Sequence, residues 1–299
     1  MALDEAEKEA IAQAHKTLRQ EYDKEASEVL ALPSKFEQIF MPAGRAFFSQ
    51  LRATVFTRLE SGEALDPFMV AFGSLLEQSK NVLESRGFFG SEEPISPADQ
   101  KTFESIKGAF KEILRADLFR AEKTEFLQFD DGRRVRLPQA SSGQQEALPL
   151  LLLMARFITL RHARGRAVYI EEPEAHLFPP TQKLMVEFLA RTFRVRKSEM
   201  SLVITTHSPY IVTSINNLLQ AGKLYASLPA SATEGLRRII PRGRSLSPGE
   251  VAFYALQDGK ATSIMDPETG LIDASVIDQV SNDIATQFDT LLLEGNEKP

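Results

Sequence analysis

Two short apolar stretches of this sequence each end in polar residues whose types could do chemistry. Ala167–Ile170 is followed by Glu171 and Glu172, and His207 comes just after Ser201–Thr205. The first carboxylate could hold Mg²⁺, directly or through water, and the second could polarise an attacking water molecule. The histidine could donate a hydrogen bond to a phosphate or position that water. We therefore take Glu171 as a candidate metal ligand, and Glu172 and His207 as candidate catalytic residues.

A third candidate site lies upstream, where Ser141, Ser142, Gly143 and Gln144 open a long apolar helix. The free backbone N–H groups and the dipole at a helix N-terminus favour a bound anion. Small residues let a phosphate approach the backbone, and the Ser141 hydroxyl adds a donor. These four are therefore candidate nucleotide-binding residues, although serine and glycine also form ordinary helix caps.

Strands and helices alternate around these residues, and this order predicts a parallel sheet. The two apolar stretches are typical of buried strands. Pro180–Arg191 predicts a helix between them, and Ser208 with Pro209 supplies an N-cap and a first helical residue for the next helix. The upstream apolar helix is expected to run to about Arg164 and to end at Gly165. Because open α/β sheets bind ligands at the carboxyl edge of their strands, the acids and the histidine are expected there.

The first 120 residues have helical spacing and give no strand signal. An amphipathic helix is expected over the first thirty residues, where apolar residues recur every three or four positions. Helical spacing dominates from Pro42 to Leu83 and again from Asp99 to Arg120, with a loop composition over Gly87–Pro97. Within this region Arg45 is either a structural salt-bridge residue or a phosphate or interface arginine.

Two hairpins and a terminal helix complete the predicted elements. Glu125–Leu137 is typical of a hairpin with its turn at Asp130-Asp131-Gly132, and a second hairpin joins Val251–Leu256 to Ala261–Met265. Ala274–Leu293 has the spacing of an amphipathic helix. We therefore divide the chain into a helical arm or insertion region at 1–120, an α/β core at 121–228, and a C-terminal hairpin and helix at 229–299.

Composition and charge exclude several classes of protein and site. Lys and Arg number 35 against 41 Asp and Glu, and the net charge of −6 excludes a wholly basic nucleic-acid sleeve. No cysteine is present, which excludes disulfides, zinc–thiolate sites, iron–sulfur clusters and thiol nucleophiles. The N-terminus has no apolar signal-peptide core, and no apolar run approaches the roughly 20 residues that span a bilayer. We expect a cytoplasmic protein that does not enter a membrane.

Three motifs taken together resemble a known family. Ala140–Gln145 (ASSGQQ), Val168–Leu177 (VYIEEPEAHL) and Val203–Pro209 (VITTHSP) are similar, in this order, to the signature motif, the Walker B motif with its D-loop, and the switch histidine of ABC-type ATPases. The similarity is closest to the SMC, RecF-like and OLD-like branch of AAA-family ATP-binding proteins. It implies a P-loop-NTPase-like α/β lobe at 121–228, preceded by the helical arm and followed by the hairpin and helix.

The resemblance also implies cofactors and roles for single residues. In such families ATP lies between two heads, and the signature serine of one head touches the γ-phosphate of the ATP that the other head holds. The implied cofactors are ATP and Mg²⁺. Carried over by position, the implied roles are trans-acting signature residues at Ser141, Gly143 and Gln144, a metal-linked acid at Glu171, a catalytic base at Glu172, a D-loop at Ala175–Leu177 and the switch histidine at His207.

The phosphate-binding loop of these families, G-x-x-x-x-G-K-[ST], does not occur in the 299 residues. Gly-Lys is found only at 222–223 and 259–260, where neither Ser nor Thr follows and the required upstream glycine is Asn217 or Tyr254. The chain resembles the second half of such an ATPase, and we expect the lobe with that loop to be missing, truncated or carried on another polypeptide. ATP hydrolysis is then expected in the complete assembly and not in this chain alone.

The resemblance implies a second ATPase head as partner, either another copy of this chain or a polypeptide that bears the phosphate-binding loop. It also implies a setting in DNA repair or antiviral defence, with a nuclease effector or DNA as further partners. Two alternatives stay open. The chain could be a non-catalytic interaction or scaffold module that binds no nucleotide on its own. It could also be a phosphodiesterase or nuclease whose acids and histidines hold Mg²⁺ or Mn²⁺. The residues of that metal cluster would be Glu171, Glu172, Glu174, His176 and His207.

Overall fold

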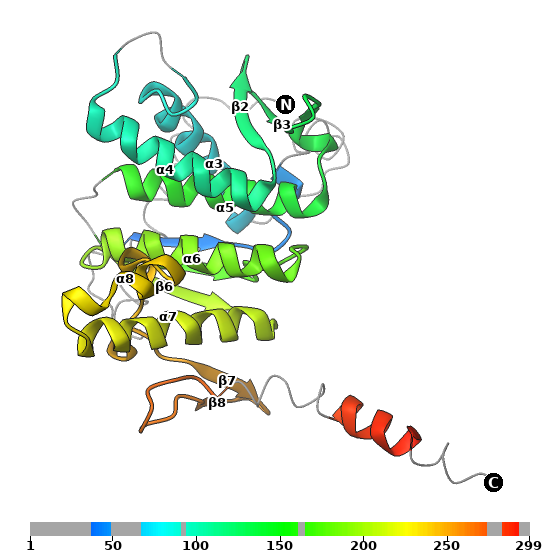
Figure 1. The fold of residues 1–299 in the computed structure, drawn as a ribbon. Coiled ribbons are helices and arrows are strands. Elements are labelled where there is room, and N and C mark those ends of the chain that lie inside the picture. Colours follow the sequence, from blue (N-terminus) through cyan, green and yellow to red (C-terminus); the bar gives the residue numbers. More distant parts are fainter. Residues whose placement is uncertain (1–36, 49–66, 91–93, 161–164, 274–282, 293–299) are drawn as a thin grey trace, which may run out of the picture.

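The sheet that carries the candidate acids is parallel and short. The computed structural model describes residues 37–48, 67–90, 94–160, 165–273 and 283–292. Within them β1 (Glu37–Met41), β5 (Arg166–Glu171) and β6 (Met200–Thr205) form one parallel sheet in the order β1-β5-β6 (Figure 1). β5 is central, and its Val168 and Ile170 side chains are buried in the core. The predicted α/β class with a parallel sheet is confirmed.

β1 corrects the expectation that the first 120 residues contain no strand. It buries Ile39 and Met41 and pairs with β5 from Glu37 opposite Arg166 to Met41 opposite Ile170. Its five residues begin with Glu and Gln, so their pattern is too short to stand out from the helical spacing around it. Because its partner strand lies far along the chain, tertiary pairing and not local propensity makes this segment a strand.

Helices pack against this sheet and against one another. The helix α5 (Ser142–Thr159) contacts α3 (Pro67–Ser85), α4 (Pro97–Leu114) and α6 (Pro179–Arg196), and α6 contacts α7 (Pro209–Ser227). In Figure 1, α6 lies between α5 and α7. One hydrophobic cluster joins α3, α4 and α5 to the sheet, and a second joins α6 and α7 to the chain that follows them. Within the described residues, no helix is long and apolar enough to cross a membrane.

Two predicted helix ends are wrong. The helix α5 ends at Thr159, followed by an extended Leu160, instead of continuing to Gly165. The β-branched Ile158 and Thr159 weaken its last turn. The helix α4 ends where Arg115 adopts a left-handed conformation with φ of 54°, so the chain does not stay helical to residue 120.

A second, antiparallel sheet follows α4. β2 (Asp117–Ala121) pairs with β3 (Thr124–Gln128), and β3 pairs with β4 (Arg134–Arg136) as the predicted hairpin. The turn between β2 and β3 is formed by Glu122 and Lys123, with φ of 47° and 61°. Sequences usually mark such a turn with Asn or Gly, and the lack of either residue explains why the pattern did not indicate β2.

The C-terminal part is built from short elements. β7 (Tyr254–Gln257) and β8 (Lys260–Ser263) form the predicted second hairpin, and residues 283–292, inside the predicted terminal helix, are helical and exposed. The helix expected over the first thirty residues lies outside the described residues, as do 49–66 of the expected helical region. The division of the chain at residues 120 and 228 stays a prediction. The remaining short helices are η1 (Leu137–Gln139), η2 (Ala230–Ala232), α8 (Glu234–Ile239), η3 (Arg242–Arg244) and η4 (Pro248–Glu250).

An ion pair and a glycine fix the segment after α7 against the helices. Arg244 of η3 pairs with Glu187 of α6. A Cβ built on Gly222 of α7 would overlap the carbonyl oxygen of Leu246. Gly222, one of the two glycines that precede a lysine, therefore has a packing role at this position.

We expect Gly222→Ala to lower the free energy of unfolding by about 1–3 kcal/mol, because the added methyl group forces α7 away from Leu246. Gly108→Ala is the matched control, since nothing lies within 4 Å of a Cβ added to that exposed position of α4. There alanine should stabilise the helix by up to about 1 kcal/mol. Urea denaturation followed by circular dichroism measures both variants, and effects of the same sign would contradict the packing role.

Candidate functional site

The carboxyl ends of β5 and β6 bring Glu172 and His207 side by side. The Glu172 N–H donates to the Thr205 carbonyl at 3.0 Å, which extends the ladder between the two strands. The His207 Nε2 lies 3.5 Å from the Glu172 Oε1, with the two side chains 87% and 42% exposed. The predicted N-cap Ser208 and first residue Pro209 of α7 are confirmed and follow directly. Both candidate side chains can therefore meet a ligand from solvent.

Glu172 has an unusual backbone conformation. Its φ of 40° lies in the left-handed region, which non-glycine residues rarely adopt. Such a conformation costs of order 1–3 kcal/mol and persists where the surrounding structure holds it. The Glu172 carbonyl accepts a hydrogen bond from the Arg45 Nη2 at 3.0 Å, and this bond helps to stabilise the left-handed conformation of Glu172.

Arg45 is a fully buried arginine that binds the backbone behind the acids. Its Nη1 donates to the carbonyls of Pro42 at 2.9 Å and Glu171 at 2.8 Å, and its Nη2 donates to Glu172. Its Nε donates to the Glu146 carbonyl at 3.2 Å. Because the side chain is 0% exposed, it does not reach a ligand. Arg45 is therefore a structural salt-bridge residue and not a phosphate-binding or interface arginine.

Glu146 is the buried counter-ion of Arg45. Its carboxylate accepts hydrogen bonds from the backbone N–H groups of Arg45 at 2.8 Å and Ala46 at 3.0 Å, and its Oε2 lies 3.6 Å from the Arg45 Nε. Burial lowers the pKa of the Arg45 guanidinium, against the opposing field of the Glu146 carboxylate. Since Glu146 belongs to the start of α5, the pair links that helix to the acids after β5.

Glu171 ends β5 with a half-buried side chain, and its Oε2 accepts a hydrogen bond from the Ala43 N–H at 3.0 Å. In the part of the chain that the structure describes, no group of three or more His, Asp or Glu side chains could hold a metal ion. Mg²⁺ in nucleotide sites is usually held by one or two carboxylates together with phosphate oxygens and water. A single carboxylate at this sheet edge fits that donor set.

Glu174 ties the loop after β5 to the loop after β6. Its Oε1 accepts hydrogen bonds from the Thr206 hydroxyl at 2.6 Å and from the His207 N–H at 3.0 Å. The side chain is buried, so it holds the backbone of His207 and does not face a solvent-accessible metal cluster. The sequence analysis did not assign Glu174 a role in positioning His207. The sequence does contain a signal for such a role, namely an acid three residues after Glu171.

The start of α5 is capped by its own side chains. The Ser141 hydroxyl accepts from the Gln144 N–H at 3.4 Å, and the Gln144 Oε1 accepts from the Ser141 N–H at 3.1 Å, which is a capping box. The Gln144 Nε2 also donates to the Leu114 carbonyl at 2.7 Å, so both ends of that amide are engaged. Ser141 and Ser142 are exposed at the helix N-terminus.

Gly143 packs on the loop after β5. A Cβ built on Gly143 would lie 2.6 Å from the His176 carbonyl oxygen and 3.4 Å from the Leu177 Cδ2. Glycine permits this approach of two backbones, so Gly143 has a packing role in addition to its predicted one. Among the described residues, no hydrogen bond or ion pair joins Ser141 or Ser142 to Glu172 or His207.

The comparison with protein-family models is a second observation, independent of this geometry. Residues 4–212 match the model of the AAA ATPase domain. The chain belongs to this family. A search of curated proteins found no match. The parallel sheet with flanking helices is consistent with a P-loop-NTPase-like AAA domain, and membership supports ATP binding and hydrolysis as the general activity of this AAA ATPase domain.

Removing the charge of Arg45 while leaving Glu146 should destabilise the AAA ATPase domain strongly. We expect Arg45→Met to lower the free energy of unfolding by about 3–5 kcal/mol, because Glu146 then stays buried without a counter-ion. Adding Glu146→Gln should recover part of that loss. Chemical denaturation of the wild type, both single variants and the double variant gives the coupling energy, and strictly additive effects would show that the two side chains act independently.

Proposed function

We propose that this chain is the catalytic half of an ABC-type ATPase head of the OLD-like and RecF-like kind, which binds and hydrolyses ATP. One observation carries the proposal: Glu172 and His207 stand 3.5 Å apart and exposed at the ends of two adjacent parallel strands. Open α/β sheets bind their ligands at this edge. An acid and a histidine with access to solvent suit the positioning and activation of a water molecule.

Glu172 takes the proton of the attacking water in this proposal. Its carboxylate is accessible, and the Arg45 bond to its carbonyl holds the backbone from which the side chain projects. His207 lies across from it and donates a hydrogen bond to the γ-phosphate or to the water. A base that is fixed in advance needs little reorganisation when the reaction begins.

Glu171 would hold the Mg²⁺ of Mg-ATP in this proposal. Bound Mg²⁺ would neutralise the charge that develops on the phosphate oxygens. The Ala43 N–H binds one carboxylate oxygen of Glu171 and so fixes the orientation of the other. Mg²⁺ in nucleotide sites usually keeps water and phosphate oxygens as its other ligands, so a single carboxylate would suffice to hold it at this edge.

The exposed serines at the start of α5 act on the ATP of a second head. Ser141 and Ser142 lie at a helix N-terminus, where backbone N–H groups favour a phosphate. The proposed action in trans rests on the motif resemblance, in which the signature serine of one head touches the γ-phosphate of the ATP that the other head holds. The second head is another copy of this chain or a polypeptide that bears the phosphate-binding loop. The proposed setting in DNA repair or antiviral defence, with DNA or a nuclease effector as partner, rests on the motif resemblance alone.

The phosphate-binding loop comes from outside these 299 residues in this proposal. Isothermal titration with Mg-ATP tests this, first on the chain alone and then on a mixture with any polypeptide encoded upstream of it that carries G-x-x-x-x-G-K-[ST]. Binding and turnover in the mixture only would support the proposal. Binding by the chain alone would contradict the need for an outside loop, and silence in both settings would favour the non-catalytic interaction module.

Glu172→Gln should abolish turnover and preserve ATP binding. The amide keeps the shape of the side chain but accepts no proton, so we expect kcat of the complete assembly to fall by about 10²–10⁴-fold. Glu268→Gln, the same change at an exposed turn residue, is the matched control. Phosphate release measures kcat and titration calorimetry measures the affinity for Mg-ATP. Affinity that falls as far as kcat would contradict the assignment of Glu172 as the base.

Ser142→Glu tests action in trans, because a carboxylate in the first turn of α5 suits the helix dipole but repels a phosphate. We expect this variant and Glu172→Gln each to be inactive in the complete assembly. In an assembly whose two heads are copies of this chain, a mixture of the two variants should regain roughly a quarter of the wild-type rate, since half of the dimers then contain one intact composite site. In that assembly, a mixture that stays inactive would mean that α5 acts on the ATP of its own head.

A further inference from the structure

A buried glutamine joins the starts of two helices. Gln182 lies in the first turn of α6 and is 9% exposed, and Ser208, the N-cap of α7, is 8% exposed. The Gln182 Oε1 accepts a hydrogen bond from the Ser208 hydroxyl at 2.6 Å, and the Gln182 Nε2 donates to the Leu177 carbonyl at 2.8 Å. Because a carbonyl only accepts, the bond to Leu177 fixes which end of the amide faces Ser208. One side chain therefore links the loop after β5 to the loop after β6.

The hydrogen bonds of Gln182 belong to a closed circuit. The Thr206 hydroxyl donates to the Glu174 Oε1, and the Ser208 N–H donates to the Thr206 hydroxyl at 3.0 Å. The Ser208 hydroxyl and Gln182 continue the circuit to Leu177, whose N–H donates to the Glu174 carbonyl at 2.9 Å. A buried polar network of this kind rigidifies the segments of backbone that it joins.

The circuit holds the backbone on both sides of His207. The His207 N–H donates to the Glu174 Oε1 at 3.0 Å, and the next N–H along the chain, that of Ser208, donates to Thr206. The two peptide groups that flank the His207 Cα are therefore both held. Since the His207 side chain is 87% exposed, the direction in which it leaves the chain toward Glu172 is set by this backbone and not by packing of the ring.

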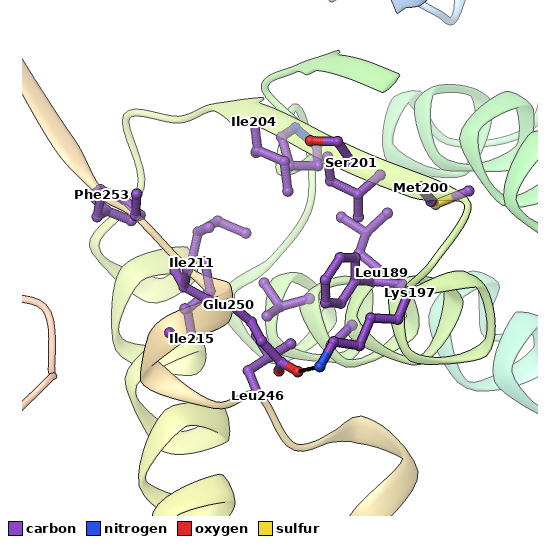
Figure 2. A pocket seen from close by; sticks show the side chains of 18 residues that line it. Leu189, Lys197, Met200, Ser201, Ile204, Ile211, Ile215, Leu246, Glu250 and Phe253 are labelled. Atoms are coloured by element: carbon purple, nitrogen blue, oxygen red, sulfur yellow. Dashed lines mark ion pairs between the residues drawn. The ribbon is translucent and has the colours of Figure 1, made fainter. Parts of the chain in front are cut away.

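Apolar packing between α6 and α7 constrains this geometry less. Leu189 of α6 and Ile211 and Ile215 of α7 line an apolar groove of about 490 Å³ beside β6 (Figure 2). Apolar contacts are non-directional, so they hold the two helices together without fixing the rotation of the first residues of α7. The hydrogen bond from Ser208 to Gln182 is directional, and it supplies that constraint.

We propose that Gln182 is a positioning residue, which sets the place of His207 relative to Glu172 through Ser208 and the loop after β5. The inference rests on the proposed function, in which the two exposed side chains act on the same water molecule and phosphate. The Ala175 N–H donates to the Glu172 carbonyl at 3.0 Å, so the loop that Gln182 holds is itself attached to Glu172. Gln182 is buried, so it acts through the backbone and does not meet the ligand.

Gln182→Met removes both hydrogen bonds of the amide and keeps a side chain of similar length. Hydrogen exchange of the full chain alone, followed by NMR, measures the protection of the His207 and Ser208 amides. We expect exchange at these amides to become faster by about tenfold or more, because the loop then opens more often. Thr192→Val is the matched control: it also removes a buried polar group of α6, but the Thr192 hydroxyl donates within its own helix, to the Phe188 carbonyl.

Ser208→Ala removes the same hydrogen bond from its other end, and Ser208→Thr keeps a hydroxyl there. We expect Ser208→Ala to speed exchange at His207 as Gln182→Met does, and Ser208→Thr to keep it near the wild-type rate. This pair decides the question even if Gln182→Met does not fold, because loss of an N-cap costs only a small part of the stability of a domain.

Turnover of the complete assembly separates positioning from stability. We expect Gln182→Met to lower kcat by about 10–100-fold with little change in KM for Mg-ATP, because a displaced His207 aligns the reacting groups poorly. Thr192→Val should keep the wild-type kcat. Phosphate release at a series of Mg-ATP concentrations measures both constants.

Faster exchange at His207 together with a lower kcat in Gln182→Met and Ser208→Ala, and neither change in Thr192→Val, would support the proposal. Unchanged exchange at His207 would overturn it, and so would faster exchange with an unchanged kcat. A wild-type assembly without turnover would instead refute the proposed ATPase function, and the exchange rates would still decide whether Gln182 holds His207.

Discussion

The Arg45 guanidinium holds together backbone from parts of the chain that lie far apart in sequence. It binds the Pro42 carbonyl after β1 and the Glu171 and Glu172 carbonyls after β5, and it pairs with Glu146 at the start of α5. Burying an ion costs several kcal/mol unless a counter-ion and hydrogen bonds compensate, and Glu146 supplies the counter-ion. The planar fork of arginine reaches carbonyls in different directions at once, which a lysine ammonium on a flexible stem would not reproduce. The geometry of the acids therefore depends on this pair.

Two buried carboxylates determine where the two exposed groups stand. Glu146 acts through Arg45 on the carbonyl of Glu172, and Glu174 acts through Thr206 and the His207 N–H on the loop after β6. The exposed side chains are thus free for a ligand, while the buried ones set the backbone beneath them. This division explains why Glu172 keeps a left-handed φ of 40° next to a solvent-accessible edge.

Features that follow from local physics could be predicted from the sequence, and features that need a distant partner could not. The two buried strands and the Ser208 cap are short-range patterns, and the structure has them. β1 needs β5 to become a strand, and the turn at Glu122–Lys123 uses residues with no turn signal. Arg45 was recognised as a salt-bridge candidate, but its partner lies 101 residues away. Gly143 was singled out for phosphate approach, and its packing on His176 could be seen only in the fold.

The exposure of the two candidate residues bears on where hydrolysis can take place. In this chain alone Glu172 and His207 are 42% and 87% exposed, so water screens any charge that they bring to a reaction. Under the proposed function, a second head that covers these two side chains would exclude water beside them and strengthen their electrostatic effect. The contact that supplies the phosphate-binding loop would then also supply the dry surroundings, and this would confine hydrolysis to the assembled protein.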